Sequence, residues 1–331
     1  MFKKIIFFTT AFTFVVVVVG AFVRLTDAGL GCPDWPGCYG KPTPVHAATD
    51  IARAVAEQGG THGPVSIQKA WHEMFHRYLA GTLGLLILGI AIAAWVKRKA
   101  LVQSPWLAST LLLLVMLQAA LGMWTVTMLL KPVIVTLHLL GGMATLALLT
   151  WLAMRQVRAG TPVADAAWLR PWAWLGLALL VAQIALGGWV STNYAALACI
   201  DLPTCHGEWM PKMDFQHGFQ LLRELGHTAA GDKLSYDALT AIHWTHRVGA
   251  VVVAFYLAWL SWRVARVSGL RAVALIIGLL LVGQVSLGIG NILTGLKLAI
   301  AVAHNAGAAL LLMALVVLNF ALSTTSHKPE S

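Results

Sequence analysis

Four histidines lie inside long apolar stretches of this 331-residue sequence, and they recur in two halves of the chain. The string Glu73-Met-Phe-His76-Arg77 returns as His243-Trp-Thr-His246-Arg247, and Val135-Thr-Leu-His138 returns as Ala301-Val-Ala-His304. Histidine inside a membrane is energetically costly and typically marks a functional site. Each half therefore offers one pair of imidazoles on two different apolar segments.

Two imidazoles from two helices are a typical ligand set for one metal centre. Two such pairs predict two centres, and haem iron with an imidazole on each face is the first candidate. His76 and His246 lie at matching depths from one membrane face, and so do His138 and His304. A lone intramembrane histidine can instead bond a neighbouring helix, but four at matched depths favour ligation of a metal.

Glu73 breaks this symmetry, because its counterpart in the second half is His243. It stands three residues before His76, so the two side chains share one helical face. Two equivalent electron-carrying centres would not need this difference, whereas one catalytic centre and one supporting centre would. A carboxylate beside a partly dry site can accept a proton or stabilise charge. The alternative is an interfacial carboxylate held by Lys69 or Arg77.

Arg77 and Arg247 each follow one of these histidines, at what we expect to be the outer membrane interface. Long basic side chains at such positions often snorkel to lipid headgroups. Arginine also binds carboxylates through two parallel hydrogen bonds, so both residues could contact haem propionates. The sequence leaves the two roles open.

The elements that must position these residues are transmembrane helices. The chain is 59% hydrophobic and 11% charged, with a mean hydropathy of +0.77, outside the range of soluble proteins. Spanning helices need about 20 apolar residues, and helices satisfy every backbone amide within their own segment. We predict an all-α integral membrane protein with eight helices, at roughly 5–24, 74–96, 105–128, 132–154, 170–193, 240–262, 270–293 and 298–322.

The two halves predict two pseudo-symmetric four-helix bundles, in residues 1–160 and 161–331. The repeat includes polar positions, since Leu30-Gly-Cys-Pro-Asp-Trp-Pro-Gly-Cys38 aligns with Leu197-Ala-Cys-Ile-Asp-Leu-Pro-Thr-Cys205. Both halves begin on the same side, so the repeats are parallel and related by an axis near the membrane normal. A Gln-x-x-Leu-Gly string occurs three times, beginning at residues 118, 183 and 284.

Basic residues in short loops predict that both termini are cytoplasmic. The net charge of +10 is thus a signal of topology and does not indicate a nucleic acid partner. The first apolar run is too long for a signal peptide and lacks a cleavage site. No transit segment precedes it, which favours a bacterial plasma (inner) membrane over a mitochondrial one.

The long loops, at roughly 25–72 and 194–239, are then outside and contain all four cysteines. Equal spacing within each pair, on the oxidising side of the membrane, predicts the disulfides Cys32–Cys38 and Cys199–Cys205. A cysteine-based metal site is the weaker alternative, because the spacing matches no familiar zinc pattern.

The sequence resembles the haem A synthase family over essentially all eight predicted helices. The resemblance rests on the Glu-x-x-His-Arg string at Glu73–Arg77, on His246-Arg247 and on the histidines at 138 and 304. It also rests on the long string Gly-Ala-Phe-Val-Arg-Leu-Thr-Asp-Ala-Gly-Leu-Gly-Cys-Pro-Asp-Trp-Pro from Gly20 to Pro36. The resemblance implies an oxidoreductase that converts a methyl group of haem O to a formyl group by successive hydroxylations.

The resemblance also implies a division of labour between the halves. His76 and His138 would flank the substrate haem O, with Glu73 as the essential acidic residue. His246 and His304 would be axial ligands of a haem b cofactor. Implied partners are membrane lipid, an unidentified electron acceptor or donor, haem O synthase, terminal oxidase assembly factors and a second copy of the chain. A di-haem electron-transfer cytochrome and a haem O binding or transfer protein are the alternatives.

Overall fold

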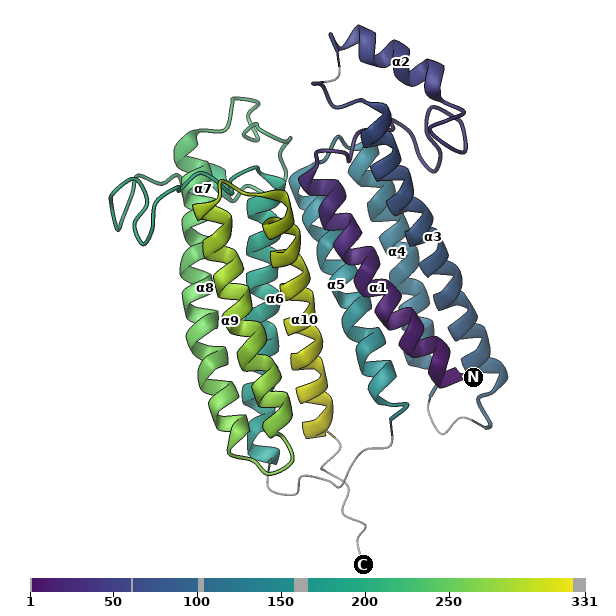
Figure 1. Cartoon of the computed structure of the whole chain (residues 1–331), viewed down its shortest axis with the longest axis vertical. Helices are drawn as coiled ribbons and strands as arrows, with labels where there is room; N and C mark the ends of the chain where they lie inside the picture. The colour runs from purple at the N-terminus through teal and green to yellow at the C-terminus, as the bar shows by residue number, and fades with distance from the viewer. Residues whose placement is uncertain (1, 61, 101–103, 158–165, 324–331) are drawn as a thin grey trace, which may run out of the picture.

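The computed structural model describes residues 2–60, 62–100, 104–157 and 166–323, and helices dominate all of them (Figure 1). Eight are long and apolar enough to cross a membrane, which confirms the predicted all-α fold. These helices are α1 (Phe2–Leu25), α3 (Ile67–Val96), α4 (Trp106–Thr127), α5 (Pro132–Met154), α6 (Arg170–Thr192), α8 (Tyr236–Ala265), α9 (Arg271–Leu293) and α10 (Leu298–Ser323).

Two of the eight helices begin earlier than their apolar residues predict. Helix α3 starts at Ile67, where the Ser66 hydroxyl accepts a hydrogen bond from the Lys69 amide. Helix α8 starts at Tyr236, after a similar cap by Ser235. Serine caps satisfy amides that have no partner within the helix. Hydropathy does not detect these first turns because they mix polar with apolar residues.

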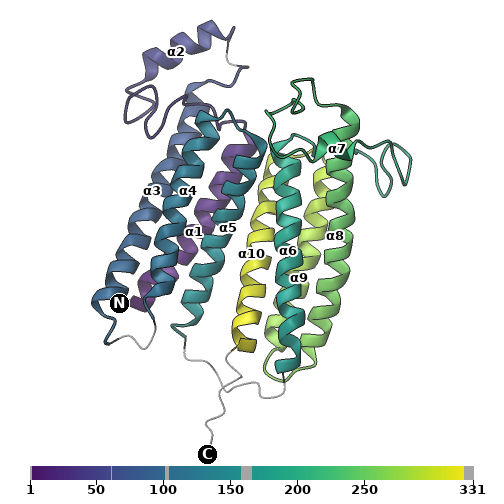
Figure 2. The ribbon, with the colours of Figure 1, turned by 180° about the vertical axis from the view of Figure 1, so that it is seen from behind.

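The two long loops contain short helices of their own. Helix α2 (Ala48–Glu57) lies beyond the end of α3, and α7 (Phe215–Gly218) lies at the ends of α6 and α8 (Figures 1 and 2). In α7 the Asp214 carboxylate accepts a hydrogen bond from the His217 amide. The loops are therefore structured, and they cover the two halves differently.

The long helices form two groups. Helices α1, α3, α4 and α5 make one group, and α6, α8, α9 and α10 make the other (Figure 2). The groups meet where α1 and α5 contact α10 and where α5 contacts α6. The expected domain boundary at 160–161 lies outside the described residues, so the two domains and their pseudo-twofold relation are still predictions.

Each group has an apolar core at the end remote from the long loops. Ile6, Ile87, Leu111 and Leu149 are fully buried in the first group. In the second group, Leu257, Leu260, Ile277, Leu315 and their neighbours are buried around Gly176 of α6. Because lipid is as apolar as these side chains, close packing rather than exclusion of water holds the helices together. The polar loops and the histidines occupy the opposite end.

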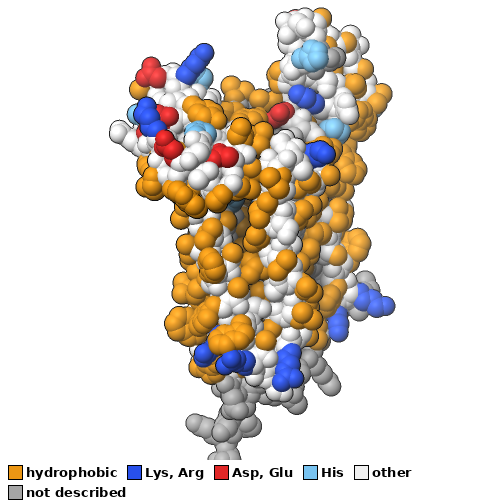
Figure 3. Space-filling view, turned by 60° about the vertical axis from the view of Figure 1, so that its left-hand side comes forward, with side chains coloured by type: hydrophobic (Ala, Val, Ile, Leu, Met, Phe, Trp, Pro, Cys, Tyr) orange, Lys and Arg blue, Asp and Glu red, His pale blue; other side chains and the backbone are white. Residues whose placement is uncertain are grey.

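Charged side chains are also distributed unevenly between the two ends of the molecule. Acidic side chains gather at the end with the long loops, while only Lys and Arg mark the opposite end (Figure 3). The basic end includes Lys97, Arg98, Arg155, Arg263 and Arg266. Arg158, Asp165, Lys328 and Glu330, which also entered the prediction, lie outside the described residues. The asymmetry supports the predicted orientation, in which the basic end faces the cytoplasm.

This orientation predicts the behaviour of reporter fusions. Alkaline phosphatase fused after Gly226, in the second long loop, should be active because the loop is exported. The same enzyme fused after Val96, between α3 and α4, should be inactive, whereas green fluorescent protein should show the reverse pattern. An active phosphatase after Val96 would contradict the assignment of the sides.

Candidate functional site

Each of the four intramembrane histidines lies against a glycine of a neighbouring helix. A Cβ atom added to that glycine would stand 2.9–3.3 Å from Cε1 of the imidazole, so a larger residue would displace the ring. The pairs are Gly20 with His76, Gly122 with His138, Gly187 with His246, and Gly288 with His304. Glycine therefore lets two helices approach closely and sets the position of each ring.

The histidines come together in the predicted pairs. His76 of α3 and His138 of α5 are close enough to interact electrostatically, and so are His246 of α8 and His304 of α10. The Nδ1 atoms of His76, His138 and His304 are buried without a hydrogen-bond partner among the described residues. Buried polar atoms normally have partners, so these rings fit a ligand that the protein itself does not provide.

The kind of metal centre follows from the same arrangement. Among the described residues, no group of three or more His, Cys, Asp or Glu side chains could hold a metal ion. Haem brings four nitrogen ligands of its own and needs only the two axial ones from the protein. Two imidazoles on facing helices, with glycine beside each ring, therefore fit haem better than a bare metal ion.

The repeated Gln-x-x-Leu-Gly string accounts for three of these contacts. Its last residue is Gly122, Gly187 or Gly288, and its glutamine lies one helical turn away. Gln183 Nε2 is 2.9 Å from His246 Nδ1, and Gln284 Nε2 is 3.4 Å from His304 Nε2. The sequence showed the string but not this role. At His76 the matching position is Val16, which cannot donate a hydrogen bond.

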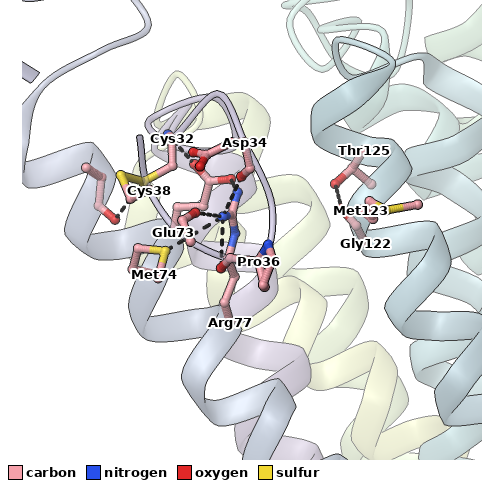
Figure 4. A network of polar contacts seen from close by, with 12 residues as sticks. Cys32, Asp34, Pro36, Cys38, Glu73, Met74, Arg77, Gly122, Met123 and Thr125 are labelled. Carbon is pink, nitrogen blue, oxygen red and sulfur yellow. Dashed lines mark hydrogen bonds and ion pairs between the residues drawn. A yellow bond between two sulfur atoms is a disulfide. The ribbon is translucent and has the colours of Figure 1, made fainter. Parts of the chain in front are cut away.

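Glu73 is held in a buried ion pair with Arg77 (Figure 4). Arg77 Nη2 donates to Glu73 Oε1 at 2.6 Å, and the two side chains are only 12% and 5% exposed. The Cys32 amide donates to Glu73 Oε2 at 2.8 Å. Lys69, the other partner that the sequence suggested, donates instead to the Gly63 carbonyl. Both carboxylate oxygens are thus fixed one helical turn from His76.

Arg77 also ties the first cysteine loop to α3. Its Nη1 donates to the carbonyl oxygens of Asp34 at 2.8 Å and Gly37 at 2.5 Å (Figure 4). A disulfide joins Cys32 to Cys38 at the base of this loop. The guanidinium therefore connects the helix, the loop and Glu73, and a contact with haem propionates is still a prediction.

In each half, an arginine of the helix binds a disulfide-closed loop, and we call this arrangement a cap. The cap of the second half has a different acceptor for the cysteine amide. Arg247 donates to the carbonyl oxygens of Asp201, Thr204 and Cys199, at 2.9, 2.9 and 2.6 Å. A disulfide joins Cys199 to Cys205. The Cys199 amide donates to His243 Nδ1 at 3.2 Å, as the Cys32 amide does to Glu73. His243 thus takes the place of the carboxylate, and among the described residues no carboxylate lies within ion-pair distance of the Arg247 guanidinium.

An aspartate shapes each cysteine loop. Asp34 accepts hydrogen bonds from the amides of Tyr39 and Gly40. Asp201 accepts them from the amides of His206 and Gly207. The Gly207 amide and the Thr204 hydroxyl hold the pKa of the Asp201 carboxyl below its ordinary value, because they stabilise the charged form. Both loops are therefore ordered by local hydrogen bonds and a disulfide.

Comparisons with known proteins find a family model and relatives that match nearly the whole chain. The family model described as cytochrome oxidase assembly protein matches residues 3–316. A protein of Shewanella oneidensis named "Heme A synthase" is 43% identical, over 98% of this chain and 96% of its own length. A protein of Rhizorhabdus wittichii with the same name is 28% identical, over 92% of this chain and 88% of its own. One from Halalkalibacterium halodurans is 26% identical, over 88% and 86%.

The buried ion pair predicts a large effect of Arg77→Ala on stability. Removing one partner of a buried pair costs about 3–5 kcal/mol, because the other charge stays buried without compensation. Thermal unfolding of the purified protein in detergent should show a clearly lower midpoint. Adding Glu73→Gln to the Arg77→Ala variant should recover part of the loss, because a neutral amide replaces the unpaired carboxylate.

Arg53→Ala is the matched control, since Arg53 pairs with Asp50 on the surface and its side chain is 68% exposed. Exposed pairs contribute about 0–1 kcal/mol, so its unfolding midpoint should barely change. Equal losses from Arg53→Ala and Arg77→Ala would contradict the special role of the buried pair.

Proposed function

The chain belongs to the cytochrome oxidase assembly protein family, and we propose that it is a haem A synthase. It acts as an enzyme of haem biosynthesis, an oxidoreductase that converts a methyl group of haem O to a formyl group through an alcohol. The observation that carries this proposal is the pairing of two similar histidine sites of which only one has a carboxylate. An electron carrier would have no use for that difference.

The first half binds the substrate. His76 and His138 ligate haem O, and residues 1–160 form the substrate domain. His246 and His304 ligate haem b, and residues 161–331 form the cofactor domain. When bound, haem b supplies one-electron redox chemistry, while the protein positions the group and tunes its potential. The glycines beside all four imidazoles and the unpartnered Nδ1 atoms support these assignments.

Glu73 is the catalytic residue. Oxidation of a methyl carbon releases protons, and a carboxylate one helical turn from His76 can accept them or stabilise positive charge. Arg77 and the Cys32 amide hold the carboxylate in place, so it is oriented before the substrate binds. Water supplies the oxygen atom, and the electrons removed from the methyl carbon pass to an external electron acceptor.

Location and partners follow from this activity. The protein is a multi-pass protein of a bacterial plasma membrane, with both termini cytoplasmic and the cysteine loops outside. Haem O is water-insoluble, so transfer from haem O synthase and delivery to a terminal oxidase under assembly would both occur in lipid. A homo-oligomer is compatible with the exposed apolar helix faces, and nucleic acid is not a partner.

The carboxylate predicts the effect of Glu73→Gln. Conversion of haem O should fall by about 10²–10⁴-fold, the usual contribution of a positioned acid or base, while haem O should still bind. Mass spectrometry of haems extracted from protein made in cells that supply haem O would show unmodified haem O in the variant. Wild-type protein and the exposed control Glu57→Gln should yield haem A or its alcohol. Unchanged conversion by Glu73→Gln would overturn the proposed mechanism.

The two histidine pairs predict separable losses of haem. His246→Ala or His304→Ala should remove haem b and its absorbance bands, while His76→Ala or His138→Ala should reduce bound haem O and its products. The exposed loop variant His46→Ala should change neither. Two molecules of haem b per wild-type chain, with no haem O or haem A, would instead indicate a di-haem electron carrier.

A further inference from the structure

A cavity of about 270 Å³ opens between α1 and α3 at the loop-bearing end of the first half. Its walls are Val19 and Phe22 of α1 and Trp71, His72 and Phe75 of α3. Trp71 and Phe75 are 37% and 53% exposed, so the cavity reaches the lipid-facing surface of the helices. Of these five residues, only His72 has a side chain that can accept a hydrogen bond, since the Trp71 indole N–H can only donate one.

This cavity adjoins the first histidine pair. His72 lies four residues before His76, one turn along the same face of α3. On α1, Val19 and Phe22 flank Gly20, whose Cα lies against the His76 ring. A flat ligand held by His76 would therefore lie about one helical turn from the cavity.

His72 has an unused polar atom in this apolar setting. Its Nδ1 is buried and has no hydrogen-bond partner among the described residues. The edge of its ring packs against Phe22, with the ring centroids 4.9 Å apart. An imidazole nitrogen without a partner is costly in apolar surroundings. Because Nδ1 has no accessible surface, a ligand hydroxyl in the cavity would bond the other ring nitrogen, Nε2, which also has no hydrogen-bond partner among the described residues.

The second half is closed at the corresponding place. Phe22 and His72 correspond to Trp189 and Ile242, which are both at least 95% buried. Helix α7 covers them: Trp189 Nε1 donates to the Gly218 carbonyl at 2.9 Å, and Gly218 packs against Ile242. Helix α2 in the first half lies beyond the end of α3 (Figure 1), and none of its residues belongs to the wall of the α1–α3 cavity. The opening is therefore a property of one half alone.

We propose that the α1–α3 cavity binds the isoprenoid chain of haem O and that His72 hydrogen-bonds the hydroxyl group at the root of that chain. Haem O carries this hydroxylated chain at a ring position where haem b has a short vinyl group. The proposal rests on the proposed function, and it explains why the first half is open at this place and the second half is closed at the corresponding one. The outer part of the chain lies in the bilayer.

The proposal also identifies the source of selectivity. Lipid is as apolar as the cavity wall, so burial of the chain alone gives little preference. The hydrogen bond to His72 contributes about two- to tenfold in affinity, the usual range for one neutral bond. The fit of the chain between Phe22, Trp71 and Phe75 adds to this preference for haem O over haem b.

A competition experiment tests the cavity. Purified full-length protein is incubated with equal amounts of haem O and haem b, both labelled with ⁵⁷Fe so that resident haem is not counted. Mass spectrometry then gives the ratio of labelled haem O and its products to labelled haem b. Wild-type protein should favour haem O. Val19→Trp, which fills the cavity, should lower the ratio to the value expected for a site that binds haem O and haem b equally well.

Two further variants refine the test. His72→Phe keeps an aromatic ring but removes the polar atoms, so the ratio should fall about two- to tenfold. Val251→Trp is the matched control, because Val251 is 55% exposed on α8 of the other half and is not part of the wall of the α1–α3 cavity. Its ratio should equal that of the wild type.

The outcomes separate this proposal from the proposed function. Conversion of haem O by a wild-type protein that takes up both haems equally would overturn the cavity assignment and leave the enzyme intact. An unchanged ratio in Val19→Trp, with less co-purified phospholipid, would show that the cavity holds a lipid chain and would also overturn it. Failure of the wild type to bind or convert haem O would overturn both the cavity assignment and the proposed function.

Discussion

The contact between each imidazole and a glycine is the constraint around which the rest of the structure is arranged. Any Cβ at these glycines would stand within 3.3 Å of the ring, so the spacing of the helices and the position of the ring are set together. Three of the glycines end the same Gln-x-x-Leu-Gly string, which also brings an amide toward the ring. His76 differs because Val16 replaces the glutamine, so the His76 ring lacks this side-chain contact.

The caps over the two histidine pairs share one frame and differ in charge. In each cap an arginine gathers the carbonyl oxygens of a disulfide-closed loop, and the amide of the first cysteine donates to a side chain on the helix. That side chain is Glu73 in one cap and His243 in the other. A buried carboxylate beside Arg77 can take part in proton transfer, whereas the corresponding position in the second cap holds the imidazole of His243. The frame is common to both caps, and the side chain that it holds on the helix is different.

The sequence predicts much of this arrangement for physical reasons. Long apolar runs reveal eight helices because lipid permits few alternatives, and the internal repeat pairs the histidines. The starts of α3 and α8 are predicted too late because serine caps and polar first turns extend these helices beyond the apolar region. The loop carbonyls that Arg77 contacts lie about 40 residues away in the chain, and backbone contacts at that range leave no sequence pattern. The α1–α3 cavity depends on how side chains pack, which the spacing of apolar residues in the sequence does not predict.

The duplicated cap has a practical consequence for anyone studying this molecule. Every substitution in one cap has a counterpart in the other, within the same chain, the same membrane and the same preparation. The loss of stability or activity after a substitution in the second cap measures what the common scaffold requires. Any additional loss after the matching substitution in the first cap measures what the Glu73 carboxylate adds. The protein thus contains its own reference state, and exchanging Glu73 and His243 between the caps would ask whether reactivity moves with the residue or stays with the half.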